Sequence, residues 1–131
     1  MTTAIPATKV LMIGLHPRAL DDDLLPNVDE EALTARIESA NRSIREAGFY
    51  AVSCLIGTSP DEAESTIRDH LASGSFGLAM IGAGVRLQPD YTVLFERIIN
   101  ALTDAAPGIR FCFNTSPETT IDALHRGIQK S

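Results

Sequence analysis

The sequence lacks several features that would assign a protein to a broad functional class. No apolar run approaches the roughly 18 residues needed to cross a bilayer, and the first residues, MTTAIPATK, contain no basic stretch followed by a long apolar one. Lys and Arg total 11 against 17 Asp and Glu, so the net charge of −6 argues against a dedicated nucleic-acid binder. We therefore expect a cytoplasmic protein with no membrane partner and no nucleic-acid partner.

Cysteine is also scarce, and its placement argues against metal or redox chemistry. Cys54 and Cys112 each lie in an apolar run, and the chain has no CxxC motif and no Cys/His cluster. This usage predicts reduced, buried thiols that behave as small apolar side chains. Residues 21–23 are three consecutive aspartates, which cannot all face one ion, so we interpret them as a solvated loop. We expect no bound metal.

The composition that remains is that of one globular domain. The 131 residues are 44% hydrophobic and 21% charged, with nine glycines and seven prolines. Short apolar runs that read as strands alternate with helical periodicity. The predicted strands are 9–14, 49–56, 76–81 and 109–113, and the predicted helices are 29–48, 59–73, 88–106 and 116–128. We assign residues 1–131 to a single α/β domain and expect residues 1–8 to form a poorly ordered tail.

The helices carry recognisable ends and one apolar stripe each. Asp29 is predicted to cap the first helix and Gly48 to end it in a left-handed conformation. Ser59, Pro60 and Glu62 form a capping pattern for the second. The predicted inward stripes are Leu33, Ile37, Ala40, Ile44 and Ala47 in the first helix; Leu94, Ile98, Ala101, Leu102 and Ala105 in the third; and Ile121, Leu124 and Ile128 in the last.

Strand–helix alternation repeated four times predicts a parallel sheet covered by helices on both faces. The runs 10–13 and 78–81 are apolar at every position, as expected of central strands, whereas 109–113 alternates and the second run contains Ser53. We predict a three-layer α/β/α, flavodoxin-like (Rossmann-like) fold with strand order 2-1-3-4. In such sheets ligands bind between strands 1 and 3, at the carboxyl ends.

The residues that follow each predicted strand favour an anionic or phosphate-bearing ligand. They include one histidine, two arginines, glycines and short polar side chains, and no carboxylate. Glycines let backbone amides approach a ligand, and arginine donates a fork of hydrogen bonds to phosphate or carboxylate. We assign Arg86 the main contact with the anion. The predicted ligand-binding residues are His16, Arg18, Thr58, Gly82, Gly84, Arg86, Asn114, Thr115 and Ser116.

Common nucleotide-binding motifs are missing. Residues 82–87 (GAGVRL) lack the third glycine of a dinucleotide fingerprint and follow the third strand rather than the first. No GxxxxGK[ST] motif occurs, so we expect no cofactor. The same glycines are also explained as turn residues, and Ser59 and Ser116 as helix caps. Spacing reveals no catalytic triad, so catalytic residues remain unassigned.

The layout of KVLMIG, REAGF, SFGLAMIG and PGIRFCFNTSPETTIDALHRG resembles a response-regulator receiver domain over about residues 9–127. The resemblance implies a regulatory interaction module, with Thr115 or Ser116 at the family's switch hydroxyl. The chain departs from that family at its acidic pair, where Gly14 and Leu15 stand, at its phosphoacceptor aspartate, replaced around Gly82, and in lacking the fifth strand with its lysine. We therefore expect no aspartyl phosphorylation.

Three functional hypotheses follow. The first is a domain that binds a small anion at the carboxyl ends of the strands, and the second is an interaction module without a ligand. The third is a small hydrolase or transferase, although the missing catalytic pattern favours a protein that is not an enzyme. The apolar arc of the third helix, which includes Tyr91, is also wide, since Phe95 and Ile99 extend it beyond a stripe that faces the core. These residues would either pack under a loop or form the surface of a homodimer.

Overall fold

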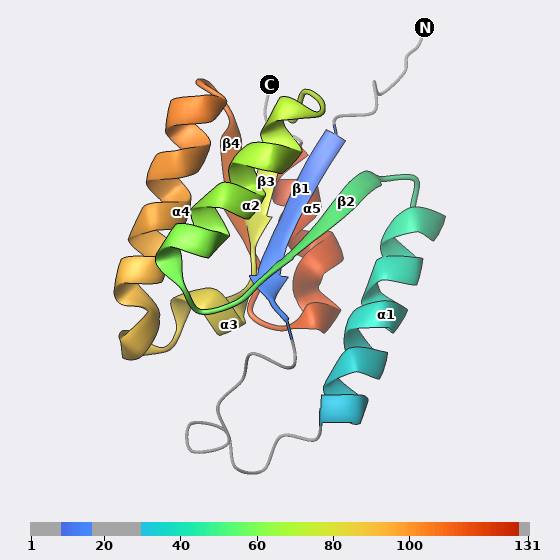
Figure 1. The fold of residues 1–131 in the computed structure, drawn as a ribbon. Coiled ribbons are helices and arrows are strands. Elements are labelled where there is room, and N and C mark those ends of the chain that lie inside the picture. The colour runs from blue at the N-terminus through green and yellow to red at the C-terminus, as the bar shows by residue number, and fades with distance from the viewer. Residues whose placement is uncertain (1–8, 17–29, 129–131) are drawn as a thin grey trace, which may run out of the picture.

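The computed structural model describes residues 9–16 and 30–128, which form one sheet flanked by helices (Figure 1). The elements in chain order are β1 (Lys9–Leu15), α1 (Glu30–Glu46), β2 (Tyr50–Ile56), α2 (Pro60–Ala72), β3 (Leu78–Ile81), α3 (Ala83–Arg86), the 3-10 turn η2 (Pro89–Tyr91), α4 (Thr92–Ala105), β4 (Arg110–Phe113), the 3-10 turn η3 (Pro117–Thr119) and α5 (Thr120–Ile128). The expected tail 1–8, Arg18, the aspartates 21–23 and the cap Asp29 lie outside the described residues.

The four strands are all parallel in the order β2-β1-β3-β4, which confirms the predicted flavodoxin-like topology. The central strands β1 and β3 are almost fully buried, while most positions of the edge strands β2 and β4 are exposed or half-buried. This burial pattern is the reason that composition alone predicted the strand order. The switch point between β1 and β3 therefore lies at the carboxyl edge of the sheet.

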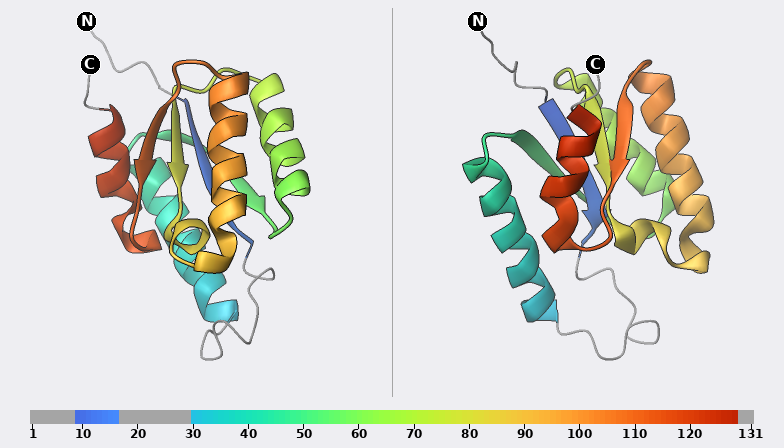
Figure 2. Two further views of the ribbon diagram at one scale, coloured as in Figure 1. Left: turned by 90° about the vertical axis from the view of Figure 1, so that its left-hand side faces the viewer. Right: turned by 180° about the vertical axis from the view of Figure 1, so that it is seen from behind.

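Helices α2 and α4 cover one face of the sheet, and α1 and α5 cover the other (Figures 1 and 2). Side chains alternate along each strand, so every strand contributes to both cores. Leu11, Ile13, Ala79 and Ile81 pack with α2 and α4, and this is the larger of the two clusters. The smaller cluster, under α1 and α5, consists of Val10, Met12, Ile44, Leu78, Met80, Cys112, Ala123 and Leu124.

Local signals in the sequence account for the start of α2 and the end of α1. Ser59 caps α2, and its Oγ accepts a hydrogen bond of 3.3 Å from the backbone N–H of Glu62. Gly48 follows α1 with φ of +94°, the left-handed conformation that was predicted from its position. Gly108 turns the chain into β4 with φ of +88°.

The chain between β3 and α4 differs from the prediction of a loop followed by a helix over residues 88–106. Residues Ala83–Arg86 form the short helix α3, then η2 follows, and α4 begins only at Thr92. Pro89 has no backbone N–H and sits at the first position of η2, where none is required. The prediction that Ala47 and Ala105 face inward was wrong, because both are exposed. Ala47 directly follows α1, and Ala105 is the last residue of α4.

Phe95 and Ile99, the residues that widen the apolar arc of α4, are half-buried and pack against the larger core cluster. The ring of Phe95 meets that of Phe113 edge-on, with 6.3 Å between ring centroids. Among the described residues, the large apolar side chains that remain exposed are Tyr50, Leu55, Leu87 and Val93.

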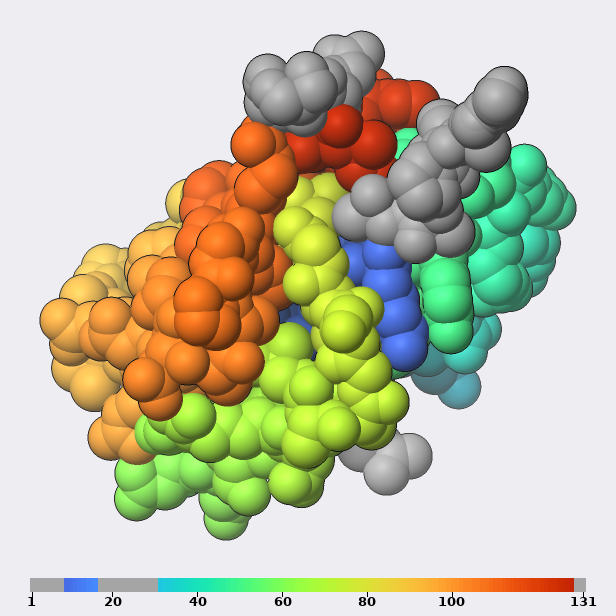
Figure 3. All heavy atoms as spheres, turned by 90° about the horizontal axis from the view of Figure 1, so that it is seen from above, coloured from blue at the N-terminus to red at the C-terminus, as the bar shows by residue number. Residues whose placement is uncertain are grey.

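Chain segments cover the amino edge of the sheet. In Figure 3 the yellow-green segment between α2 and β3 runs across this edge, between the start of β4 and the start of β1. There the Lys9 ammonium lies 4.8 Å from the centroid of the Phe76 ring and 5.3 Å from that of Tyr50. Within the described residues, no helix is long and apolar enough to span a membrane.

Candidate functional site

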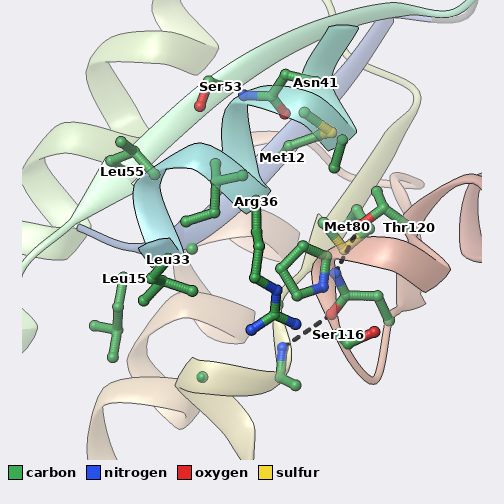
Figure 4. A pocket seen from close by; sticks show the side chains of 18 of the residues that line it. Met12, Leu15, Leu33, Arg36, Asn41, Ser53, Leu55, Met80, Ser116 and Thr120 are labelled. Carbon is green, nitrogen blue, oxygen red and sulfur yellow. Dashed lines mark hydrogen bonds between the residues drawn. The ribbon is translucent and has the colours of Figure 1, made fainter. Parts of the chain in front are cut away.

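A pocket of about 510 Å³ lies at the opposite, carboxyl edge of the sheet, between α1 and the strands (Figure 4). Its volume falls in the range typical of small-molecule sites. Residues from β1, β2, β3, α1, α3 and the start of α5 form its wall, and the ends of β1 and β3 both contribute. The pocket therefore occupies the switch point at which the topology predicted a site.

The floor of the pocket is hollow because of a glycine in a central strand. Met12 is in register with Ser53 on one side and Met80 on the other, and all three line the pocket. Gly14 comes two residues after Met12, so it faces the same side of the sheet but has no side chain to fill the space. A methyl group on Gly14 would meet no atom of the described residues within 4 Å.

The first helix forms the roof of the pocket. Its predicted core residues Leu33, Ile37 and Ala40 are only half-buried and line the pocket, and Ile44 alone is fully buried. The stripe therefore has the predicted orientation, but near the amino end of α1 it faces an open pocket in place of a packed core. Leu15 and Leu55 extend this apolar surface from the strands, as Figure 4 shows.

Among the described residues that line the pocket, Arg36 is the one that carries a charge. Its Nε and Nη2 each donate a hydrogen bond of 2.8 Å to the carboxylate of Glu118. Hydrogen bonding to Arg36 is the main reason that the pKa of Glu118 falls to about 2, and the same contact raises the pKa of Arg36. The two side chains are about half exposed, so both remain accessible to solvent.

Asn114 connects three elements at the end of the pocket. Its side-chain oxygen accepts a hydrogen bond of 2.9 Å from the backbone N–H of Ala83, and its amide nitrogen donates one of 2.8 Å to Oγ1 of Thr120. Figure 4 draws both bonds. The side chain is buried, and these bonds tie the end of β4 to the first residues of α3 and α5. Asn114 therefore supports the wall of the pocket with both of its polar atoms.

The structure brings together only some of the residues predicted to bind a ligand. Gly82, Gly84, Asn114 and Ser116 line the pocket. His16, Thr58, Arg86 and Thr115 do not line it, and Arg18 lies outside the described residues. The backbone N–H of His16 donates to Ile56, and that of Thr115 donates to Oγ1 of Thr119.

Arg86 is occupied by contacts within the fold. Its Nη2 donates to the backbone carbonyl of Asn114, and its guanidinium lies over the ring of Phe113, 5.1 Å from the centroid. Its Nε is buried and has no hydrogen-bond partner among the described residues. The side chain packs at the end of β4 instead of reaching the pocket.

The residues that the sequence reasoning missed are the apolar lining and Arg36. Two features of the sequence are consistent with the pocket. Gly14 is a small residue at an inward position of a central strand, and Ala32, Arg36 and Ala40 recur every four residues beside the apolar stripe of α1. Spacing of four places these three residues on one line of the helix, and all three line the pocket.

The thiols and acidic side chains offer little reactive chemistry here. Burial raises the pKa of both Cys54 and Cys112 to about 11, which keeps these thiols protonated. Over the part of the chain that the structure describes, no three His, Cys, Asp or Glu side chains cluster where they could hold a metal ion.

Compared with protein-family models, with curated proteins and with solved structures, the chain matches none.

Proposed function

We propose that this α/β domain binds a small organic anion with an apolar body, in the pocket between α1 and the sheet. The observation that carries the proposal is the combination of a 510 Å³ apolar pocket at the β1/β3 switch point with the cation of Arg36 among the described residues that line it. An apolar pocket with a few placed polar groups is the usual form of a small-molecule site. The anion predicted from the sequence is thus assigned to Arg36 in place of Arg86.

The apolar body of the ligand would take its affinity from the side chains of Met12, Leu33, Leu55 and Met80. Burying one methylene group is worth about 0.8 kcal/mol, or roughly a fourfold gain in affinity. A homologous series of alkyl carboxylates should therefore bind more tightly with each added carbon until the pocket is full. A surface that binds ions by charge alone would give no such dependence on chain length.

The experiment is calorimetric titration of the full chain with the series from butanoate to dodecanoate, repeated on the Gly14→Leu variant. A Cβ at Gly14 would meet no described atom within 4 Å, so the side chain of leucine can start into the open pocket and occupy its volume. We expect binding to be lost in this variant while thermal stability is retained. Gly57→Leu is the matched control, since Gly57 also faces open space but does not line the pocket.

Three outcomes would contradict the proposal. No member of the series binds the wild-type chain, as expected of an interaction module without a ligand, or Gly14→Leu folds and binds as tightly as wild type. A loss of binding in both glycine variants would likewise count against the pocket, because the control does not touch it.

A further inference from the structure

The guanidinium of Arg36 has one edge in use and one edge free. A guanidinium carries five N–H donors arranged along its planar edges. Glu118 takes the edge formed by Nε and Nη2, one hydrogen bond to each of its oxygens. Nη1 has no partner among the described residues, so the second edge, formed by Nη1 and Nη2, is available. In Figure 4 the guanidinium extends past Leu33 toward Ser116, among side chains that all line the pocket.

The pair with Glu118 also fixes how that free edge is presented. Two hydrogen bonds to one carboxylate hold a guanidinium in a defined plane, which a single bond or a lysine would not do. Glu118 lies outside the lining of this pocket. It is therefore a positioning residue, which orients Arg36 without contacting the ligand.

The charged groups near the free edge of Arg36 favour a ligand with a single negative charge. Glu118 is ionised at neutral pH, since its pKa is about 2, and it lies beside the same guanidinium. The other polar side chains that the described residues bring to the lining are uncharged: Asn41, Ser53, Asn114, Ser116 and Thr120. A second negative charge on the ligand would meet no further cation from this part of the chain and would be repelled by Glu118.

We propose that the ligand of this pocket is a monocarboxylate with an apolar chain, whose two oxygens accept hydrogen bonds from the free Nη1–Nη2 edge of Arg36. This inference rests on the proposed function and narrows it, because it excludes the phosphate-bearing ligands that the sequence also allowed. A planar carboxylate matches the two parallel donors of the guanidinium edge. A phosphate monoester offers a similar edge but brings a second charge.

The test compares three probes of equal chain length on the full chain: octanoate, octyl phosphate and octan-1-ol. Titrations are run at about pH 7.5, where a phosphate monoester with a second pKa near 6 is mostly dianionic. We expect octanoate to bind most tightly, with octan-1-ol and octyl phosphate each weaker by roughly tenfold or more. If octyl phosphate bound as tightly as octanoate, the assignment of a monocarboxylate would be overturned, and the proposed function would still hold. Failure of all three to bind would instead overturn the proposed function.

Variants of the ion pair test the mechanism of selection. Arg36→Gln should weaken the binding of octanoate by roughly tenfold to a hundredfold and leave the binding of octan-1-ol nearly unchanged. Arg42→Gln is the control, because Arg42 is exposed on the same helix and does not line the pocket. Glu118→Gln should raise the affinity for octyl phosphate more than the affinity for octanoate, since it removes a charge that repels the second negative charge of the phosphate. Equal losses of octanoate and octan-1-ol in Arg36→Gln, or equal effects of Glu118→Gln on both anions, would overturn the assignment.

Discussion

Arg36 and Glu118 lie 82 residues apart in the chain and meet through two parallel hydrogen bonds of 2.8 Å. The contact joins α1 to η3, on the face of the sheet where the pocket separates α1 from the strands. Of the α1 side chains whose burial is described, Ile44 is fully buried, and Leu33, Ile37 and Ala40 are half-buried. The ion pair adds a link between the pocket's roof and η3 and orients the guanidinium of Arg36.

The first prediction concerns acid. The pKa of Glu118 is lowered from 4.5 to about 2 in the folded protein, so its ionised form favours folding. That contribution is complete above pH 4.5, shrinks as the pH falls, and is lost near pH 2. Urea unfolding measured across this range should show a smaller loss of stability for Glu118→Gln than for the wild type. Parallel curves for the two proteins would contradict the prediction, as would a carboxyl NMR titration of Glu118 centred at 4.5.

The second prediction concerns Arg86. Because its guanidinium contacts the Asn114 carbonyl and the Phe113 ring, Arg86→Ala should lower the free energy of unfolding by about 1–2 kcal/mol. Alkyl carboxylate binding should not change, because the side chain does not line the pocket. Chemical unfolding and titration of the same preparation measure both, with Arg42→Ala as the control for loss of a surface arginine. The reverse result, unchanged stability with weakened binding, would show that Arg86 contacts the anion, as the sequence predicted.

The third prediction concerns Asn114. Replacing it with leucine keeps the approximate shape but leaves the N–H of Ala83 and the hydroxyl of Thr120 without their partner. We expect a loss of about 1–3 kcal/mol in unfolding free energy. Thr120→Val removes only one of the two bonds and should cost less. Equal stability of Asn114→Leu and wild type in urea unfolding would show that these bonds do not hold the edge together.

The fourth prediction concerns the packing of α5. A methyl group on Gly127 would lie 2.7 Å from Cδ1 of Leu78 and 3.3 Å from Cβ of Cys112, both buried. Overpacking of this kind costs about 1–3 kcal/mol, more than alanine gains over glycine near a helix end. Gly127→Ala should therefore lower the melting temperature, whereas Gly57→Ala, which faces open space, should not. A Gly127→Ala variant as stable as the wild type would mean that Leu78 can move aside.

The fifth prediction concerns the thiols. With Cys54 and Cys112 buried and the pKa of each near 11, neither should react with a disulfide reagent in the folded protein at about pH 8. Both should react once urea unfolds the chain. Rapid labelling of either thiol without denaturant would contradict this, and absorbance of the released thiolate measures the rate.

The sequence by itself determined the fold, because each signal is local and agrees with the others. Uninterrupted apolar runs in β1 and β3 require burial on both faces, while Ser53 in β2 and alternation in β4 are tolerated only at the edges. Gly48 and Ser59 marked helix ends because the conformations they favour depend on one residue and its immediate neighbours. The carboxyl edge, where the pocket lies, followed from topology alone.

Only the tertiary structure decided which side chains form the site. Arg36 belongs to a helix, not to a strand end, and it reaches the pocket because α1 packs across the sheet above Gly14. Arg86 follows a strand as predicted. Its guanidinium nevertheless contacts the Phe113 ring and the Asn114 carbonyl and does not line the pocket. The direction of a long side chain depends on contacts with residues distant in sequence, and periodicity along one segment contains no information about those contacts.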